Sequence, residues 1–239
     1  MRHAFVTGAS RGIGRAAASA LAAEGLVTWL GFKEREDAAR DLASEIARGG
    51  GEARPLHVDV ASPESCKEAI RTIDSVGPLV AFVHAAGVHE ELSMLRGNEA
   101  HWRRVVDTNL TSFYSLGVHV ARSMMRARGG SVVAIGSVVG RCGLEHSAAY
   151  CASKSGLVGL VRSMSRELGR HGIRVNLVSP GWIETDMTRG RPVERVLARI
   201  PLSRTGTPED VAACVRFLCS EGAAYVTGAE IPVAGGLDM

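Results

Sequence analysis

Short apolar runs alternate with longer stretches of helical periodicity along almost the whole chain. The apolar runs, rich in β-branched residues, predict seven strands at His3–Thr7, Leu26–Phe32, Ala53–Asp59, Leu79–His84, Ser131–Gly136, Arg174–Val178 and Glu230–Val233. The stretches between them predict helices that begin near Gly12, Lys33, Pro63, Glu99, Ala148, Arg191 and Pro208. Strands that alternate with helices are typical of βαβ units, so we expect an α/β fold: a doubly wound parallel sheet with helices on both faces.

The helix-start signals and the connecting segments of the chain support one continuous domain over residues 1–239. Ser62-Pro63 and Thr207-Pro208 each place a capping residue before a proline, which is the pattern of a helix start. We find no low-complexity linker between the predicted elements. The segment Trp182–Arg204 contains glycines and prolines, and it is predicted to form an irregular flap with a short helix after the sixth strand.

Composition narrows the class of protein further. With 46 % hydrophobic residues the chain can build a sizeable core, and 28 basic against 25 acidic residues give no reason to expect nucleic acid. No apolar run approaches the roughly 20 residues of a membrane span, and the first strand begins too early for a signal peptide. The five scattered cysteines are typical of a cytoplasmic protein, and with the histidines they show no metal-ligand spacing, so we expect no metal.

The first predicted strand runs into the loop Thr7–Gly14, TGASRGIG, from which the first helix starts. Glycines at these spacings let the backbone turn sharply and approach a pyrophosphate at the helix N-terminus. Such a loop alone also fits any tight turn. Its place at the start of a βαβ unit favours a Rossmann-type dinucleotide site.

The end of the second strand indicates which dinucleotide binds. Lys33 stands where a cation would accommodate a 2′-phosphate, and Arg11 of the glycine loop can reach the same group. Glu34 sits near the position of an acidic ribose ligand, but Lys33 and Arg35 flank it, so we predict NADP(H). Asp59, at the end of the third strand, is either an adenine ligand or a strand-end cap.

Three reactive side chains are predicted to share one cleft. Ser137 follows the strand Ser131–Gly136, and Tyr150 and Lys154 lie one turn apart on the helix that begins near Ala148. An ammonium about 4 Å from a phenol favours the phenolate by roughly 4 kcal/mol, or about three pKa units. We therefore expect a lowered pKa for Tyr150, which would let it exchange a proton with a carbonyl group near neutral pH.

With these motifs in this order, the chain resembles the short-chain dehydrogenase/reductases over essentially its whole length. The resemblance is carried by the glycine loop, the Tyr-x-x-x-Lys pair, Asn109, Ser137 and Pro180-Gly181. Within the family it is most similar to the bacterial 3-oxoacyl-[acyl-carrier-protein] reductases, because the segments 135–140, 181–188 and 233–237 resemble theirs.

The resemblance implies NADPH-dependent reduction of a 3-oxoacyl thioester, carried by a carrier protein, in fatty-acid or polyketide-type synthesis. It implies catalytic roles for Asn109, Ser137, Tyr150 and Lys154, with Asn109 holding a water that relays protons to Lys154. It also implies a homotetramer. The implied cofactor-binding residues are Gly8, Ser10, Arg11, Gly12, Ile13, Gly14, Lys33, Asp59, Val60, Ala86, Gly87, Tyr150, Lys154, Pro180, Gly181, Ile183 and Thr185.

An acidic carrier protein would need a basic surface beside the cleft. In the family, arginines at two helix ends contact the carrier. Arg128 matches the first position, whereas His171 stands at the second, with Arg170 adjacent. Cations at helix ends also complement the helix dipole, so both explanations stay open.

The chain departs from the family at His84-Ala85, where two asparagines are usual. We expect His84 to be a buried, hydrogen-bonded core residue rather than one that titrates near neutral pH. Two alternative functions remain: a family member acting on a free small ketone, sugar or polyol, and a regulatory NADP-binding protein without catalysis.

Overall fold

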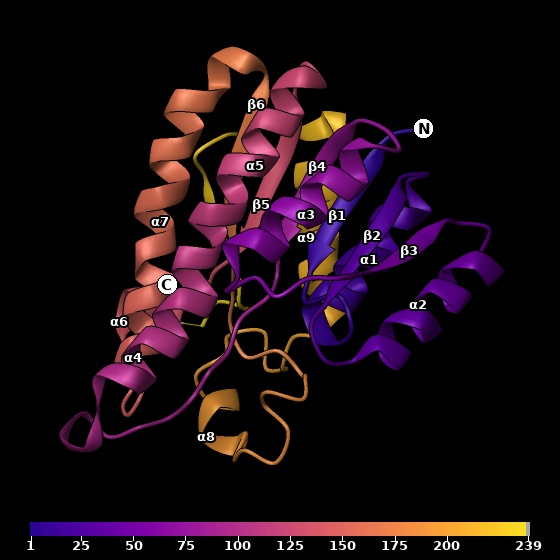
Figure 1. Ribbon diagram of the computed structural model, residues 1–239. Helices are drawn as coiled ribbons and strands as arrows, with labels where there is room; N and C mark the ends of the chain where they lie inside the picture. Colours follow the sequence, from indigo (N-terminus) through magenta and orange to yellow (C-terminus); the bar gives the residue numbers. More distant parts are fainter. Residues whose placement is uncertain (238–239) are drawn as a thin grey trace.

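A parallel sheet of seven strands forms the centre of the computed structural model, which describes residues 1–237 (Figure 1). Its order is β3-β2-β1-β4-β5-β6-β7, and each neighbouring pair is parallel. The strands are β1 (His3–Thr7), β2 (Val27–Phe32), β3 (Ala53–His57), β4 (Leu79–His84), β5 (Gly130–Ile135), β6 (Ile173–Pro180) and β7 (Glu230–Val233). The predicted doubly wound sheet is confirmed, and the order reverses between β1 and β4.

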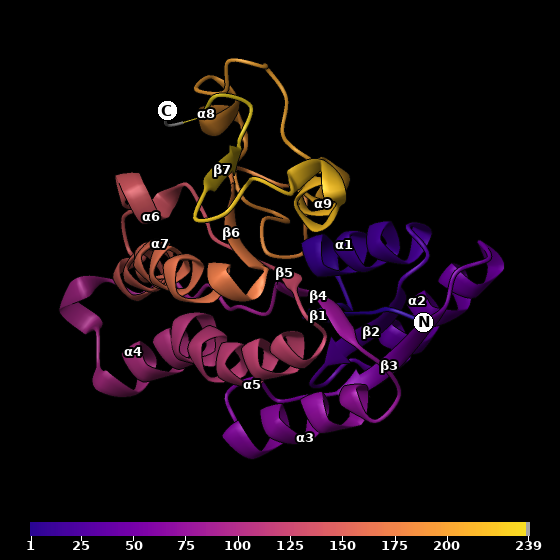
Figure 2. The same cartoon turned by 90° about the horizontal axis from the view of Figure 1, so that it is seen from above.

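Helices cover both faces of the sheet, as Figure 2 shows from above. The helices are α1 (Gly12–Ala23), α2 (Glu36–Arg48), α3 (Pro63–Asp74), α4 (Glu99–Val106), α5 (Ser112–Arg126), α6 (Val139–Cys142), α7 (Ala148–Leu168), α8 (Glu194–Leu197) and α9 (Pro208–Cys219). Helices α1, α2 and α9 pack on one face, and α3, α5 and α7 pack on the other. Each face therefore has its own apolar core.

The central strands are buried on both sides, which is why they consist of continuous apolar runs. On one face Phe5 stacks on Phe82, with ring centroids 5.5 Å apart, above the helices α3 and α5. On the other face small residues such as Ala17 and Ala18 of α1 allow that helix to approach the sheet closely. Because all the strands are parallel, their carboxyl ends lie at one edge of the sheet.

The predicted helix starts at Pro63 and Pro208 are confirmed, together with their caps. The Ser62 hydroxyl accepts from the Ser65 amide, and Thr207 forms a reciprocal capping box with Asp210. Two other starts lie further along than predicted: α2 begins at Glu36 instead of Lys33, and α8 begins at Glu194 instead of Arg191. In both places a loop of a few residues separates the preceding strand or turn from the first helical residue.

The predicted long helix from Glu99 is interrupted. A π-helical turn at Asp107–Thr111 separates α4 from α5. The extra residue in this turn rotates α5 relative to α4, which a regular 3.6-residue period cannot anticipate. No helix among the described residues is long and apolar enough to cross a membrane.

The flap Trp182–Arg204 lies beyond the carboxyl ends of the strands, in orange at the bottom of Figure 1. It contains the short helix α8, as predicted. A bridge between Ile183 and Gly206 closes its base. Ile200 packs with Val138 in a small apolar cluster, which joins the flap to the segment that follows β5.

Candidate active site

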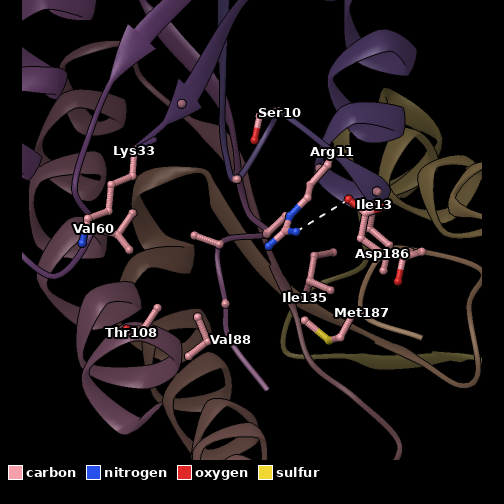
Figure 3. A pocket seen from close by; sticks show the side chains of 18 of the residues that line it. Ser10, Arg11, Ile13, Lys33, Val60, Val88, Thr108, Ile135, Asp186 and Met187 are labelled. Carbon is pink, nitrogen blue, oxygen red and sulfur yellow. Dashed lines mark ion pairs between the residues drawn. The ribbon is translucent and has the colours of Figure 1, made fainter. Parts of the chain in front are cut away.

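A cavity of about 500 Å³ opens at the carboxyl ends of the strands. Its wall combines the glycine loop after β1, the ends of β2 to β6, the first turns of α7 and the base of the flap. Every cofactor-binding residue predicted from the sequence lines this cavity, and Ser137 lines it as well. Figure 3 shows part of its wall, with Lys33 and Val60 on one side and Met187 on the other.

The glycine loop has a shape that side chains would prevent. Gly8 has φ +67°, and a Cβ there would lie 2.9 Å from the Ala86 amide nitrogen. A Cβ on Gly14 would lie 2.3 Å from the carbonyl oxygen of Gly8. The loop therefore lies close to the segment after β4 and leads into α1, whose first residue is Gly12. This cradle at a helix N-terminus fits the diphosphate of a dinucleotide.

Charged side chains gather at the β2 and β3 end of the cavity. The Lys33 ammonium pairs with the Asp59 carboxylate at 2.9 Å, and the Ala61 amide donates to Asp59 at 3.0 Å. Burial opposes ionisation of Asp59, but the hydrogen bonds from Lys33 and Ala61 outweigh it and lower the pKa of Asp59. Asp59 therefore caps the turn after β3, as one of the two predicted alternatives states. The Arg11 and Arg35 side chains turn instead toward Asp186 in the flap, at 3.6 Å and 3.2 Å.

The structure brings Ser137, Tyr150 and Lys154 together. Ser137 follows β5, and its hydroxyl forms a hydrogen bond with the Tyr150 phenol in the first turn of α7. One turn further, Lys154 donates to the carbonyl oxygen of Ile135 at 2.8 Å, and its Nζ lies 5.6 Å from the centre of the Tyr150 ring. A hydroxyl, a phenol and an amine thus face one cavity.

Burial changes the pKa of both α7 residues. Desolvation raises the pKa of Tyr150, and the hydrogen bond with Ser137 offsets this only in part. Desolvation also lowers the pKa of Lys154 to about 8. The predicted lowering of the Tyr150 pKa is therefore wrong for this structure. Coulomb attraction to the Lys154 ammonium favours the phenolate, but in this structure the cost of burying the phenolate is larger.

Asn109 occupies the π-helical turn Asp107–Thr111 and is completely buried. Its Oδ1 accepts from the Val88 amide at 2.8 Å, and its Nδ2 donates to the Val88 carbonyl oxygen at 2.9 Å. A Cβ added to Gly87 would lie 3.1 Å from Asn109 Oδ1 and 3.6 Å from Lys154 Nζ, so the amide and the amine are near neighbours. Asn109 therefore braces the segment after β4 directly beside Lys154.

His84 lies at the end of β4 with both ring nitrogens hydrogen-bonded. Ser112 Oγ donates its hydrogen to the Thr108 carbonyl oxygen at 2.6 Å, so it accepts from His84 Nε2 at 3.1 Å. In a neutral ring with its hydrogen on Nε2, Nδ1 is an acceptor, so Thr7 Oγ1 donates to it at 3.2 Å while accepting from the Ala86 amide. We therefore assign a neutral ring with its hydrogen on Nε2. Desolvation lowers the pKa of His84 to about 3, and the prediction of a buried, hydrogen-bonded histidine is confirmed.

His89 is a cavity-side residue that the sequence did not single out. Its ring packs against that of Tyr150, with centroids 4.3 Å apart, and its Nε2 lies 2.9 Å from Ser147 Oγ. Two residues further along the chain, Glu91 pairs with Arg191 of the flap at 2.5 Å. No motif marks these positions, because their proximity arises only when the flap folds back over the segment after β4.

The predicted carrier-docking residues lie away from the cavity, at the opposite ends of α5 and α7. Arg128 follows α5 and is exposed, and Arg170 and His171 lie in the 3₁₀ turn after α7. The two segments touch, because the Gly130 amide donates to the Gly172 carbonyl oxygen at 3.2 Å. The three side chains therefore belong to one surface region. Within the described residues, no group of three or more histidine, cysteine or acidic side chains is placed to hold a metal ion.

Comparisons with known proteins agree with this geometry. The profile of a family described as "Enoyl-(Acyl carrier protein) reductase" matches residues 8–238. The 3-oxoacyl-[acyl-carrier-protein] reductase FabG of Pseudomonas aeruginosa is 43 % identical over 240 residues, which covers 99 % of this chain and 97 % of the relative. The enzyme of the same name from Escherichia coli K12 is 40 % identical over 239 residues, with the same coverage of both chains.

Solved structures are similar over almost the full length as well. A proposed gluconate dehydrogenase from Agrobacterium tumefaciens superposes with a TM-score of 0.95 at 33 % identity, covering 99 % of this chain and 95 % of the other. A proposed short-chain alcohol dehydrogenase from Sinorhizobium meliloti 1021 gives a TM-score of 0.94 at 36 % identity, covering 98 % and 95 %.

Proposed function

The chain belongs to the short-chain dehydrogenase/reductase family, and from this premise we propose that it uses NADPH to reduce the keto group of a 3-oxoacyl thioester. It is an oxidoreductase that acts on CH–OH and C=O groups and takes a nicotinamide cofactor. The alternative of a regulatory protein without catalysis is set aside on the same findings. The observation that carries the proposal is the meeting of Ser137, Tyr150 and Lys154 at the cavity that the glycine loop also lines.

In the proposed reaction the nicotinamide, when bound, supplies a hydride to the substrate carbon. Tyr150 donates a proton to the substrate oxygen, and its raised pKa keeps that proton in place at neutral pH. The Ser137 hydroxyl, which is hydrogen-bonded to the Tyr150 phenol, donates a hydrogen bond to the substrate oxygen as negative charge develops there. Lys154 would hold the nicotinamide ribose hydroxyls, and its ammonium, 5.6 Å from the centre of the Tyr150 ring, would resupply the proton.

Asn109 keeps the proton path in position in this proposal. Its amide fixes Val88 through two hydrogen bonds and lies beside the Lys154 amine. We propose that it also holds the relay water that the family resemblance implies.

The preference for NADPH rests on the charge at the β2 end of the cavity. Three cations, Lys33, Arg11 and Arg35, line this end of the cavity. The guanidinium groups match the oxygens of a phosphate well. Glu34 lines the same end of the cavity, and its neighbours Lys33 and Arg35 in the chain keep the local charge positive. Asp59 caps the turn after β3 and pairs with Lys33, and we propose that the same carboxylate also hydrogen-bonds the adenine.

A carrier-bound substrate is proposed from the relatives, which are named as acyl-carrier-protein reductases. We propose that the basic region of Arg128, Arg170 and His171 receives the acidic carrier, although it lies at the ends of α5 and α7 away from the cavity of the same chain and not beside the cleft as expected. If it does, Arg128→Glu raises the KM for a carrier-bound substrate but not for a free thioester. Arg40→Glu on α2, which makes the same charge change on a distant helix, serves as the control. An equal effect of both variants, or none, would contradict carrier docking here.

A second candidate is a free hydroxy acid, sugar or alcohol substrate, which the names of the solved relatives favour. His89, whose ring packs against Tyr150, is the polar side chain that would lie nearest to such a substrate. We further propose that the chain forms a single domain, acts in the cytoplasm and assembles as a homotetramer through α4, α5, α7 and β7.

The test is turnover by the purified protein. With NADPH and an acetoacetyl thioester, loss of nicotinamide absorbance is expected, with NADH a poorer donor. Tyr150→Phe should reduce kcat by about 100-fold or more, because a general acid contributes about that much, while leaving NADPH binding intact. Undiminished turnover by this variant would refute the mechanism. Reduction of free sugars or alcohol oxidation without thioester turnover would favour the second candidate.

A further inference from the structure

The flap carries a carboxylate that three arginines share. Asp186 pairs with Arg11 of the glycine loop at 3.6 Å, with Arg35 after β2 at 3.2 Å and with Arg189 of the flap at 2.9 Å. Figure 3 shows the Arg11 side chain reaching across the cavity to Asp186. One anion therefore joins three segments that are distant in the sequence, at the end of the cavity with the most positive charge.

The flap also rests on the glycine loop at this point. A Cβ on Gly12 would lie 3.3 Å from the Thr185 methyl carbon, so the residue before Asp186 is in contact range of the loop. The Thr188 hydroxyl donates to the Ile183 carbonyl oxygen at 2.7 Å and accepts from the Thr185 amide at 3.0 Å, which gives the base of the flap a defined shape. Asp186 is thus held over the loop that receives the phosphates.

We propose that Asp186 is a specificity-determining residue of the cofactor site, because its carboxylate competes with the 2′-phosphate of the cofactor for Arg11 and Arg35. Binding of the phosphorylated ribose then exchanges one anion for another and frees the base of the flap. This inference rests on the proposed use of NADPH. It gives Asp186 a role separate from catalysis, since none of the reacting groups touches it.

The exchange is physically reasonable because the existing pairs are solvated. The Arg11 and Arg35 side chains are 58 % and 54 % exposed, so solvent screens both ion pairs and leaves them weak. A phosphate carries close to two negative charges and three acceptor oxygens, so it binds guanidinium groups more strongly than a carboxylate does. The carboxylate lowers the affinity for the phosphate without preventing binding.

Two small ligands isolate the effect. Adenosine 2′,5′-bisphosphate and adenosine 5′-monophosphate differ only in the 2′-phosphate, and calorimetric titration of the full chain gives a Kd for each. Asp186→Asn should lower the Kd for the bisphosphate about fivefold, the size expected for removing competing surface ion pairs. The Kd for the monophosphate should not change.

Glu184→Gln is the matched control, because it removes the same charge two residues away. The Glu184 carboxylate accepts from the Thr205 hydroxyl, on the far side of the flap base. This variant should leave both Kd values unchanged. An Asp186→Asn variant that binds the bisphosphate no more tightly than the wild type would overturn the proposal. The proposal would also be overturned if Asp186→Asn lowered the Kd for both ligands equally, or if Asp186→Asn and Glu184→Gln changed the Kd values equally. Either result would indicate only a general change in the electrostatic potential at the site.

The release of the flap has its own readout in amide hydrogen exchange. In the wild type, the bisphosphate should speed exchange over residues 184–191 relative to the monophosphate, and in Asp186→Asn this difference should vanish. Identical exchange with both ligands in the wild type would overturn the coupling. If the wild type binds the bisphosphate no better than the monophosphate, the proposed NADPH preference itself fails. If instead the wild type binds the bisphosphate tightly and Asp186→Asn does not change its Kd, only the proposed role of Asp186 fails.

Discussion

Lys154 lies at the inner end of the cavity, where desolvation lowers the pKa of its ammonium to about 8. The pKa of Tyr150 is raised, so its proton stays in place at this pH. We therefore predict that kcat/KM for carbonyl reduction falls as pH rises through about 8, because Lys154 loses its proton there. Lys154→Arg, which remains charged, should remove this limb from the pH–rate profile even though its activity is lower. A wild-type limb first seen near pH 10 would contradict the prediction.

His84 links folding stability to pH. Its pKa is about 3 in the folded chain and about 6.5 in an unfolded one, so between these values only the unfolded state binds the proton. Stability from this residue is thus complete above about pH 6.5 and decreases by about 1.4 kcal/mol per unit as pH falls.

The variant His84→Asn tests this linkage. It should be less stable than the wild type at pH 7, because the smaller side chain leaves unfilled space and cannot make both hydrogen bonds. The stability difference should shrink by about 2 kcal/mol between pH 7 and pH 5, since only the wild type loses this contribution. Urea unfolding at several pH values measures it. A difference that stays constant with pH would show that His84 does not supply the linkage.

The residues with a motif could be predicted from the sequence, and those without one could not. Ser137, Tyr150 and Lys154 were found because strand and helix periods fix their relative positions. Asp186 directly follows the predicted ligand Thr185 yet was missed, because two of its arginine partners come from distant segments. The direction of the Tyr150 pKa shift was predicted wrongly, because the burial of a side chain cannot be deduced from the spacing of residues in the sequence.

At the scale of elements, the short helix α6 is tied to the sheet edge by an ion pair. Arg141 of α6 binds Glu230 of β7 through Nε at 2.9 Å and through a second nitrogen at 2.9 Å, and Ser179 Oγ donates to the same carboxylate at 2.8 Å. The Glu230 side chain is only 7 % exposed. The pair therefore holds the segment between Ser137 and Tyr150 against β6 and β7.

Removing the two partners should have unequal effects. Arg141→Met leaves a buried carboxylate with Ser179 as its remaining partner, so we predict a loss of about 2–3 kcal/mol. Glu230→Gln should cost less, about 1 kcal/mol, because the neutral amide keeps the Ser179 bond and buries no charge. Chemical unfolding of both single variants and the double variant gives the coupling energy. The buried pair would be contradicted if the two single variants lost equal free energies of unfolding, or if the loss in the double variant equalled the sum of the two single losses.

The elements themselves were mostly predictable, with one instructive exception. Strand positions followed from apolar runs, and the caps at Ser62 and Thr207 marked two helix starts. The π-helical turn at Asp107–Thr111 was not predicted, because one inserted residue leaves local composition unchanged. It is this turn that directs Asn109 toward Val88, so the sequence identified the residue but not its geometry.

At the scale of the whole molecule, parallel strands gather every loop of the site at one edge and leave the outer faces of the helices available for assembly. Figure 2 shows α5 and α7 side by side on the outside of one layer. Tyr114 and Met125 on α5 are 59 % and 42 % exposed, and lie eleven residues apart, which is close to three turns and places them on one side. On α7 the exposed residues include small ones, namely Ala148, Ala152, Ser155 and Gly159.

A second copy of the chain is the expected partner of this face, because a symmetric dimer pairs such a surface with itself. A Cβ on Gly159 would meet no atom within 4 Å, so a larger side chain fits the monomer and would obstruct only a partner. We predict that the wild type sediments as a tetramer and that Gly159→Arg sediments as a smaller species. At low protein concentration, the thermal unfolding of the secondary structure should be the same for Gly159→Arg as for the wild type. Val76→Arg, at an exposed apolar position outside this face, should leave the tetramer intact. A monomeric wild type, or a Gly159→Arg tetramer, would show that α5 and α7 do not form the interface.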